Sequence, residues 1–112
     1  MSRHLLILAD KIGRNDAKLG DVLMRSFVHT LARHEDPPLS VMLLNEGVRL
    51  ACEGSAVLED LLLLQEKGIT VKACGTCLDH LGLRESLATG EVGTMAGTVE
   101  TLMGRYDVVT IA

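Results

Sequence analysis

The sequence is poor in aromatic and basic residues. It holds one Tyr, one Phe and no Trp, and its formal net charge is −4. Single-stranded nucleic acids are usually bound by stacking their bases on aromatic side chains, and this chain has almost none to offer. Without a stripe of positive charge, a nucleic acid or another polyanion is also a poor partner. Because aromatic residues are so scarce, the core must be built from aliphatic side chains.

Long apolar runs are missing as well. The first run, residues 5–9, is too short to cross a membrane, and it lacks the length and the cleavage site of a signal peptide. We therefore expect a cytoplasmic protein that does not bind a membrane and whose three cysteines are reduced thiols. The 112 residues suit a single domain over residues 1–112.

Short apolar runs alternate with stretches of helical periodicity. This alternation predicts an α/β domain in which a parallel sheet lies between two layers of helices. Ser55 and Thr94 are expected to be N-caps, and Gly68 is expected to end a helix in the left-handed region. Strands are expected at residues 4–9, 39–44, 69–73, 90–93 and 106–111, and the main helices at residues 19–33, 55–67 and 94–103.

Two apolar groups bear on how the predicted helices pack. Four consecutive leucines at residues 61–64 point all round a helix, whereas a single core needs only one stripe. The excess predicts a subunit interface, with simple deep burial as the alternative. In the last predicted helix, one face is shared by Met95, Val99, Leu102 and Met103.

The chemistry is expected at Cys74 and Cys77. In open parallel sheets, ligands bind beyond the carboxyl ends of the strands. Cys74 falls at the end of the third predicted strand, and Cys77 falls in the first turn of the next segment. A helix N-terminus there should stabilise a thiolate or a persulfide anion and lower the thiol pKa. The spacing also allows one sulfur to attack the other.

Four neighbouring residues are expected to shape this site. Gly75 should let the backbone approach a bound partner closely, and the N–H groups of Gly75 and Thr76 should line the pocket. Asn45 and Glu46 follow the adjacent predicted strand, where they could meet Cys74. The alternative for Asn45 and Glu46 is an ordinary turn pair.

Other interpretations of the cysteines stay open. Cys-Gly-Thr-Cys is similar to a thioredoxin-like dithiol, but it follows the third predicted strand, and no aromatic residue precedes it. Cys74, Cys77 and His80 supply three zinc ligands, whereas a closed structural site needs four. The thiols could also be structural in a non-catalytic oligomeric module. Cys52 has no partner in sequence and is expected in the core. No cofactor is expected, since no nucleotide-binding fingerprint is present.

Several segments together resemble a known family. They are Gly13 to Gly20, residues 45–55 (Asn-Glu-Gly-Val-Arg-Leu-Ala-Cys-Glu-Gly-Ser), residues 74–79 (Cys-Gly-Thr-Cys-Leu-Asp), Gly82-Leu83, and Gly90-Glu91-Val92 followed by Met95. On these residues the chain resembles the DsrE/DsrF-like sulfur-relay family. It is most similar to the C-terminal domain of the YedF sulfurtransferase-like proteins linked to selenium metabolism.

The resemblance implies a three-layer α/β/α sandwich with a mostly parallel five-stranded sheet, assembled into trimers or hexamers. It also implies that sulfur travels as a cysteine persulfide between donor and acceptor proteins. Cys74 with Gly82 looks like the family's sulfur-carrying cysteine and the glycine that closes the following short helix. Cys77 belongs to the YedF-like variant. We therefore expect Cys74 to accept sulfur, and Cys77 to hold it or to release it by forming a disulfide.

YedF-like proteins usually carry an N-terminal domain similar to the small sulfur carrier TusA. The present sequence starts at the first predicted strand of the second domain. We therefore expect either a standalone relative or a separate donor protein, such as a TusA-like carrier.

Overall fold

The computed structural model describes residues 2–112, which form one five-stranded sheet. All strand pairs are parallel, and the spatial order is β4-β3-β2-β1-β5. The α/β class and the parallel sheet predicted from the sequence are confirmed. The strands are β1 (Arg3–Ile7), β2 (Ser40–Leu43), β3 (Thr70–Cys74), β4 (Glu91–Gly93) and β5 (Asp107–Ile111).

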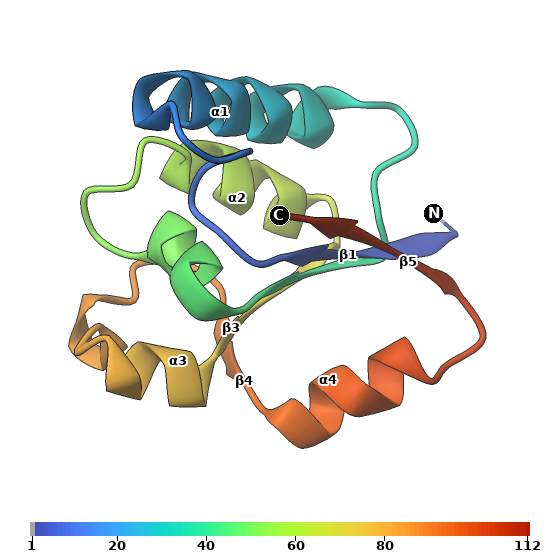
Figure 1. Ribbon diagram of the computed structural model, residues 1–112. Coiled ribbons are helices and arrows are strands. Elements are labelled where there is room, and N and C mark those ends of the chain that lie inside the picture. Colours follow the sequence, from blue (N-terminus) through green and yellow to red (C-terminus); the bar gives the residue numbers. More distant parts are fainter. Residues whose placement is uncertain (1) are drawn as a thin grey trace.

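Helices cover both faces of the sheet (Figure 1). Two helices, α1 (Ala17–Arg33) and α2 (Leu58–Glu66), lie side by side on one face. The opposite face carries α3 (Gly75–His80) and α4 (Met95–Leu102). Two 3-10 helices, η1 (Asn45–Ala51) and η2 (Arg84–Ser86), lie in the connections. This arrangement is the three-layer α/β/α sandwich that the family resemblance implies.

The face beneath α1 and α2, here called the sealed face, holds most of the core. Side chains of β1, β2 and β3 that point to this face are almost inaccessible to solvent, and so are the inward residues of both helices. Packing of this kind is the main source of stability in a domain of this size. Its members include Leu5, Ile7, Met24, Val28, Val41, Leu43, Leu61, Leu64 and Val71.

The helix boundaries follow local capping, with one correction. The predicted N-cap Thr94 is confirmed, because its Oγ1 accepts a hydrogen bond from the Gly97 N–H at 3.0 Å. Gly68 adopts φ +89° after α2, as expected. Ser55 is not an N-cap: α2 begins three residues later, and the Ser55 hydroxyl accepts the Val57 N–H within the preceding turn. The helix instead starts after Val57, which is buried and has no side-chain cap.

The leucine run exposes less apolar surface than expected. Leu61 and Leu64 are fully buried and Leu63 is partly buried, so that only Leu62 projects into solvent. Other exposed apolar side chains lie on α1 and α4, among them Leu19 and Met95, each about half exposed. Within residues 2–112, no helix has the length and hydrophobicity needed to span a membrane.

Candidate thiol site

The loops that follow β2 and β3 meet at the candidate site. These strands are parallel neighbours, so the segments leaving their carboxyl ends lie at the same edge of the sheet. Cys74 is the last residue of β3, Cys77 lies in α3, and Asn45 begins η1. The backbone N–H of Asn45 donates a hydrogen bond to the Cys77 Sγ at 3.1 Å. The structure therefore brings three predicted site residues together.

Asn45 reaches the sulfur through an unusual backbone conformation. Its φ is +51°, in the left-handed region, which costs an L-residue about 1–2 kcal/mol and which Asn tolerates better than most. Two residues later, a Cβ added to Gly47 would overlap the carbonyl oxygen of Ile7, so η1 packs directly on the end of β1. Backbone strain of this kind concentrates at functional sites. Asn45 thus acts on Cys77 through its main chain.

Cys74 and Cys77 are neighbouring free thiols. Cys74 is the N-cap residue of α3 and is only 5% exposed, whereas Cys77 is partly exposed. Burial raises the pKa of Cys77, a hydrogen bond with Cys74 raises it further, and the Asn45 N–H opposes the rise. The expectation of a lowered pKa is therefore wrong at Cys77. Desolvation of the thiolate outweighs the single N–H donor and the six-residue helix.

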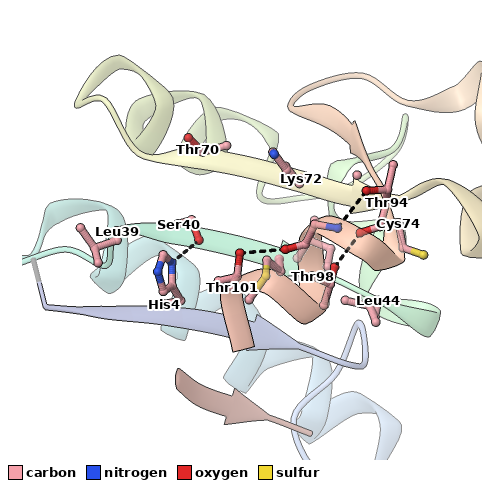
Figure 2. A pocket seen from close by; sticks show the side chains of 14 residues that line it. His4, Leu39, Ser40, Leu44, Thr70, Lys72, Cys74, Thr94, Thr98 and Thr101 are labelled. Carbon is pink, nitrogen blue, oxygen red and sulfur yellow. Dashed lines mark hydrogen bonds between the residues drawn. The ribbon is translucent and has the colours of Figure 1, made fainter. Parts of the chain in front are cut away.

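Cys74 and Cys77 line different spaces. Cys77 lines an open pocket at the carboxyl edge of the sheet. Cys74 instead lines a cavity between the sheet and α4, which Figure 2 shows from close by. The pair can therefore be approached from two sides. The other residues of the Cys77 pocket are Leu8, Leu44, Asn45, Thr76, His80 and Leu81.

Gly75 leaves room for the side chains that pack against it. A Cβ at this position would lie 3.0 Å from Cγ1 of Val92 and 3.1 Å from a guanidinium nitrogen of Arg84. The space that a side chain would need is thus filled by the protein itself. Thr76 is exposed and lies beside Cys77 in the open pocket.

Glu46 is engaged with a residue of its own loop. Its carboxylate forms an ion pair with Arg49, whose pKa is raised as a result. Within residues 2–112, no hydrogen bond or ion pair links Glu46 to either cysteine of the pair. The turn interpretation of Glu46 is therefore the one that its contacts favour.

The segment after Cys77 is held by a glycine and an ion pair. Gly82 adopts φ +70° and donates its N–H to the carbonyl of Asp79 at 3.1 Å, which closes α3. Arg84 contacts Asp79 through two hydrogen bonds of 2.8 and 2.9 Å and lowers the pKa of that carboxyl. Gly82 therefore ends the short helix that begins after Cys74.

Cys52 and His80 fall outside the thiol pair. Cys52 is 3% exposed and donates its S–H to the Val48 carbonyl at 3.2 Å, which confirms it as a core residue. In the described part of the chain, no three His, Cys, Asp or Glu side chains gather as a metal would require. His80 therefore does not complete a zinc site with Cys74 and Cys77.

The cavity beside Cys74 was not predicted from the sequence. It lies between β2 and α4, and the polar residues that line it come from β3 and α4, among them Lys72, Thr98 and Thr101. The sequence nevertheless contains a pattern that points to polar groups on this side of the sheet. Thr94, Thr98 and Thr101 recur at helical spacing, and Lys72 alternates with buried Val71 and Ala73 along β3.

Known proteins resemble the chain in fold. No family model matches it, and no curated protein is found to be similar in sequence. The crystal structure of the ychN protein from E. coli superposes with a TM-score of 0.72 at 18% identity, covering 99% of this chain and 100% of that one. MTH1491 from Methanobacterium thermoautotrophicum, titled a protein of unknown function, gives 0.63 at 20% identity and covers 98% and 99%. Both are proteins of the DsrE-like fold, and the present chain shares that fold.

Proposed function

We propose that this chain is a cytoplasmic sulfur-relay protein that carries sulfane sulfur as a persulfide on Cys74 and Cys77. The observation that carries the proposal is the hydrogen bond from the Asn45 N–H to the Cys77 Sγ. A strained backbone aims this donor at a partly exposed sulfur with a second thiol beside it. The DsrE-like fold and the resemblance of residues 45–55 and 74–79 to YedF-like proteins also support it.

The raised pKa of Cys77 is compatible with this role. Burial keeps the idle thiol protonated at neutral pH, which protects it from unwanted oxidation. A persulfide is a stronger acid than its parent thiol, so it ionises more readily in the same pocket. The Asn45 N–H then stabilises the negative charge on sulfur. The site thus favours the loaded state over a free thiolate.

The transfer needs no external oxidant. The Cys77 sulfur attacks the outer sulfur of a donor persulfide R–S–SH, the donor's S–S bond breaks, and R–SH leaves with the proton given up by Cys77. The product is Cys77–S–SH. An acceptor thiol can then take the outer sulfur, or Cys74 can attack the inner sulfur to form a disulfide and release hydrosulfide. A protein donor loads Cys77 first in this scheme, because Cys74 is only 5% exposed and too enclosed to meet a bulky partner.

The partners follow from the same chemistry. Donor and acceptor are proteins that present a persulfide or a thiol to the open pocket of Cys77, and a TusA-like carrier is the proposed donor. We also propose a homo-oligomer, a trimer or a hexamer, which would cover exposed apolar side chains such as Met95 and Met103. No resident cofactor is required.

One rival function has an observation in its favour. If the thiols are structural parts of a non-catalytic oligomeric module, the raised pKa of Cys77 is simply a consequence of burial. This rival predicts thiols that never acquire sulfur. It differs from the relay in one measurable property, the mass of the protein after exposure to a donor.

The test is intact-mass measurement after incubation with a TusA-like carrier that holds a persulfide. The relay predicts a gain of one sulfur mass, mapped to Cys77, which reductant removes. Cys77→Ser should abolish loading from this protein donor, and Cys74→Ser should still load but fail to release hydrosulfide. Cys52→Ala serves as the matched control and should load as the wild type does. Loading in the Cys74→Ser, Cys77→Ser double variant equal to that of the wild type would overturn the assignment.

A further inference from the structure

Helix α4 turns apolar residues toward solvent and polar residues toward the sheet, which is the reverse of an ordinary core helix. Its apolar residues Met95 and Val99 are 52% and 48% exposed. Its small and polar residues Gly97, Thr98 and Thr101 line the space between the helix and the sheet. An amphipathic helix normally buries its apolar stripe. The inward placement of hydroxyl groups therefore adds polar groups to a space whose lining also includes Leu39, Met42 and Leu44.

The space beneath α4 is a cavity of about 220 Å³. Cys74 and Thr94 lie at one end of it, and His4 and Ser40 lie at the other, joined by a 2.6 Å hydrogen bond (Figure 2). Lys72 and Thr94 are exposed, so the cavity opens to solvent near Cys74. Cys74 is thus reachable from this side although little of its surface meets bulk water.

The hydrogen-bonding groups of the cavity come in two kinds. Thr98 and Thr101 donate their hydroxyl protons to the Thr94 and Gly97 carbonyls, at 3.1 and 3.0 Å, which leaves their oxygens as acceptors. The Thr94 hydroxyl accepts the Gly97 N–H and keeps its own proton to donate. The Lys72 ammonium forms no hydrogen bond or ion pair with any residue of the described chain. The cavity therefore offers both a cation and acceptors beside a thiol.

We propose that this cavity binds cysteine persulfide and presents its outer sulfur to Cys74. The ligand's carboxylate would meet Lys72 and Thr94, and its ammonium would meet the hydroxyl oxygens of Thr98 and Thr101. A volume of about 220 Å³ suits one amino acid better than a tripeptide. The inference rests on the proposed relay and adds a second, low-molecular-weight entry for sulfur through Cys74.

The step balances without a further reactant. The Cys74 sulfur attacks the outer sulfur of cysteine persulfide, and the S–S bond of the ligand breaks as a new S–S bond forms on Cys74. The proton of the Cys74 thiol leaves with the departing sulfur, so that free cysteine is released. The product is Cys74–S–SH, and the Cys77 thiol beside it can pass the sulfur toward the open pocket.

The experiment uses the Cys77→Ser protein, so that sulfur cannot migrate within the pair. Its initial rate of sulfur gain is measured by intact mass and peptide mapping at subsaturating cysteine persulfide. Lys72→Met, which keeps a long side chain but loses the charge, should lower this rate about tenfold, as expected for loss of one charge-assisted hydrogen bond. Lys18→Met, at an exposed position on α1 outside the cavity, is the control and should load at the unaltered rate. Equal rates for the Lys72 and Lys18 variants would overturn the inference.

A second probe tests the size of the ligand. Glutathione persulfide should load Cys74 more slowly than cysteine persulfide, and Lys72→Met should not change its rate. Equal loading by both probes contradicts a fitted cavity. If a TusA-like persulfide loads Cys77 in the wild type while cysteine persulfide leaves Cys74 unmodified, the cavity inference fails and the relay stands. If neither donor adds sulfur, both fail.

Discussion

The two faces of the sheet are built on different principles. On the sealed face, β-strand side chains such as Val41 and Leu43 are fully buried beneath the aliphatic stripes of α1 and α2. On the opposite face, Lys72 and Thr70 are exposed, and no residue of α4 is buried. One face supplies the stability that a small domain needs. The other can therefore be left polar and open beside a reactive pair of thiols.

The largest expected difference between buried and open regions is in thiol reactivity. Cys77 borders the open pocket, whereas Cys52 is 3% exposed within the core. Under native conditions Cys77 should react with iodoacetamide at least about 100-fold faster than Cys52, because Cys52 becomes accessible to the reagent only when the core around it unfolds locally. Quantitative peptide mapping measures both rates in one sample. Equal rates would mean that the core is not sealed.

The pH dependence of the same reaction tests the sign of the pKa shift. Burial favours the neutral thiol of Cys77, so its pKa should lie above its ordinary value of 9.0. Below that pKa the alkylation rate should rise about tenfold per pH unit, since only the thiolate reacts. The rate should not level off until the pH exceeds 9.0. A plateau near neutrality would instead indicate a thiolate stabilised by the backbone.

The second largest effect is on stability, within the leucine run of α2. Leu64 is fully buried and Leu62 is 51% exposed. Leu64→Ala should lower the free energy of unfolding by about 2–5 kcal/mol, because it removes core contacts and leaves a cavity. Leu62→Ala should change it by less than about 0.5 kcal/mol in the isolated chain. Urea denaturation of both variants measures the contrast, and equal losses would contradict the burial pattern.

A smaller contrast is expected between two glycines near the thiol site. A Cβ at Gly47 would overlap a backbone carbonyl, which cannot move easily, whereas one at Gly75 would meet the side chains of Val92 and Arg84. Gly47→Ala should therefore cost about 1–3 kcal/mol, and Gly75→Ala less than that. Thermal unfolding of the two variants measures the difference. A larger loss for Gly75→Ala would show that the β4 side is the more rigid.

The smallest expected effect concerns Asn45. Asn45→Gly keeps the backbone N–H that reaches Cys77 and relieves the left-handed strain, so sulfur loading should be preserved. Asn45→Ala keeps the N–H but adopts this conformation less readily, and it should lose about 1 kcal/mol of stability. Unfolding curves and intact-mass loading assays check both. Lost loading in Asn45→Gly would mean that the amide side chain, and not the backbone, is required.

The sequence predicted the fold well because its elements are locally encoded. Alternating aliphatic runs and helical periodicity located all five strands, and Thr94 and Gly68 marked helix ends through their own side-chain and backbone preferences. The predicted N-cap of α2 is wrong because the Ser55 hydroxyl accepts a hydrogen bond within the preceding turn, and the helix starts after the buried Val57. The direction in which α4 turns its methionines was equally hidden, since helical spacing groups Met95 with Val99 but does not say which face meets the sheet.

Sequence position predicts which loops meet at the candidate site, but it does not predict the electrostatics there. The rule that strand ends carry the chemistry led us to expect Asn45 near Cys74, whereas the contact that forms is from the Asn45 backbone N–H to Cys77. The raised pKa of Cys77 depends on how much water reaches the sulfur, which sequence spacing does not encode. The packing of Val92 and Arg84 against Gly75 likewise depends on tertiary contacts that sequence spacing does not encode.

The central claim is that the thiol pair at the end of β3 carries sulfane sulfur. The most direct measurement is the intact mass of freshly purified protein before any reductant is added. The account predicts a fraction heavier by one sulfur, which returns to the unmodified mass on reduction and is absent from the Cys74→Ser, Cys77→Ser double variant. A single unmodified mass that no persulfide donor can raise would contradict it.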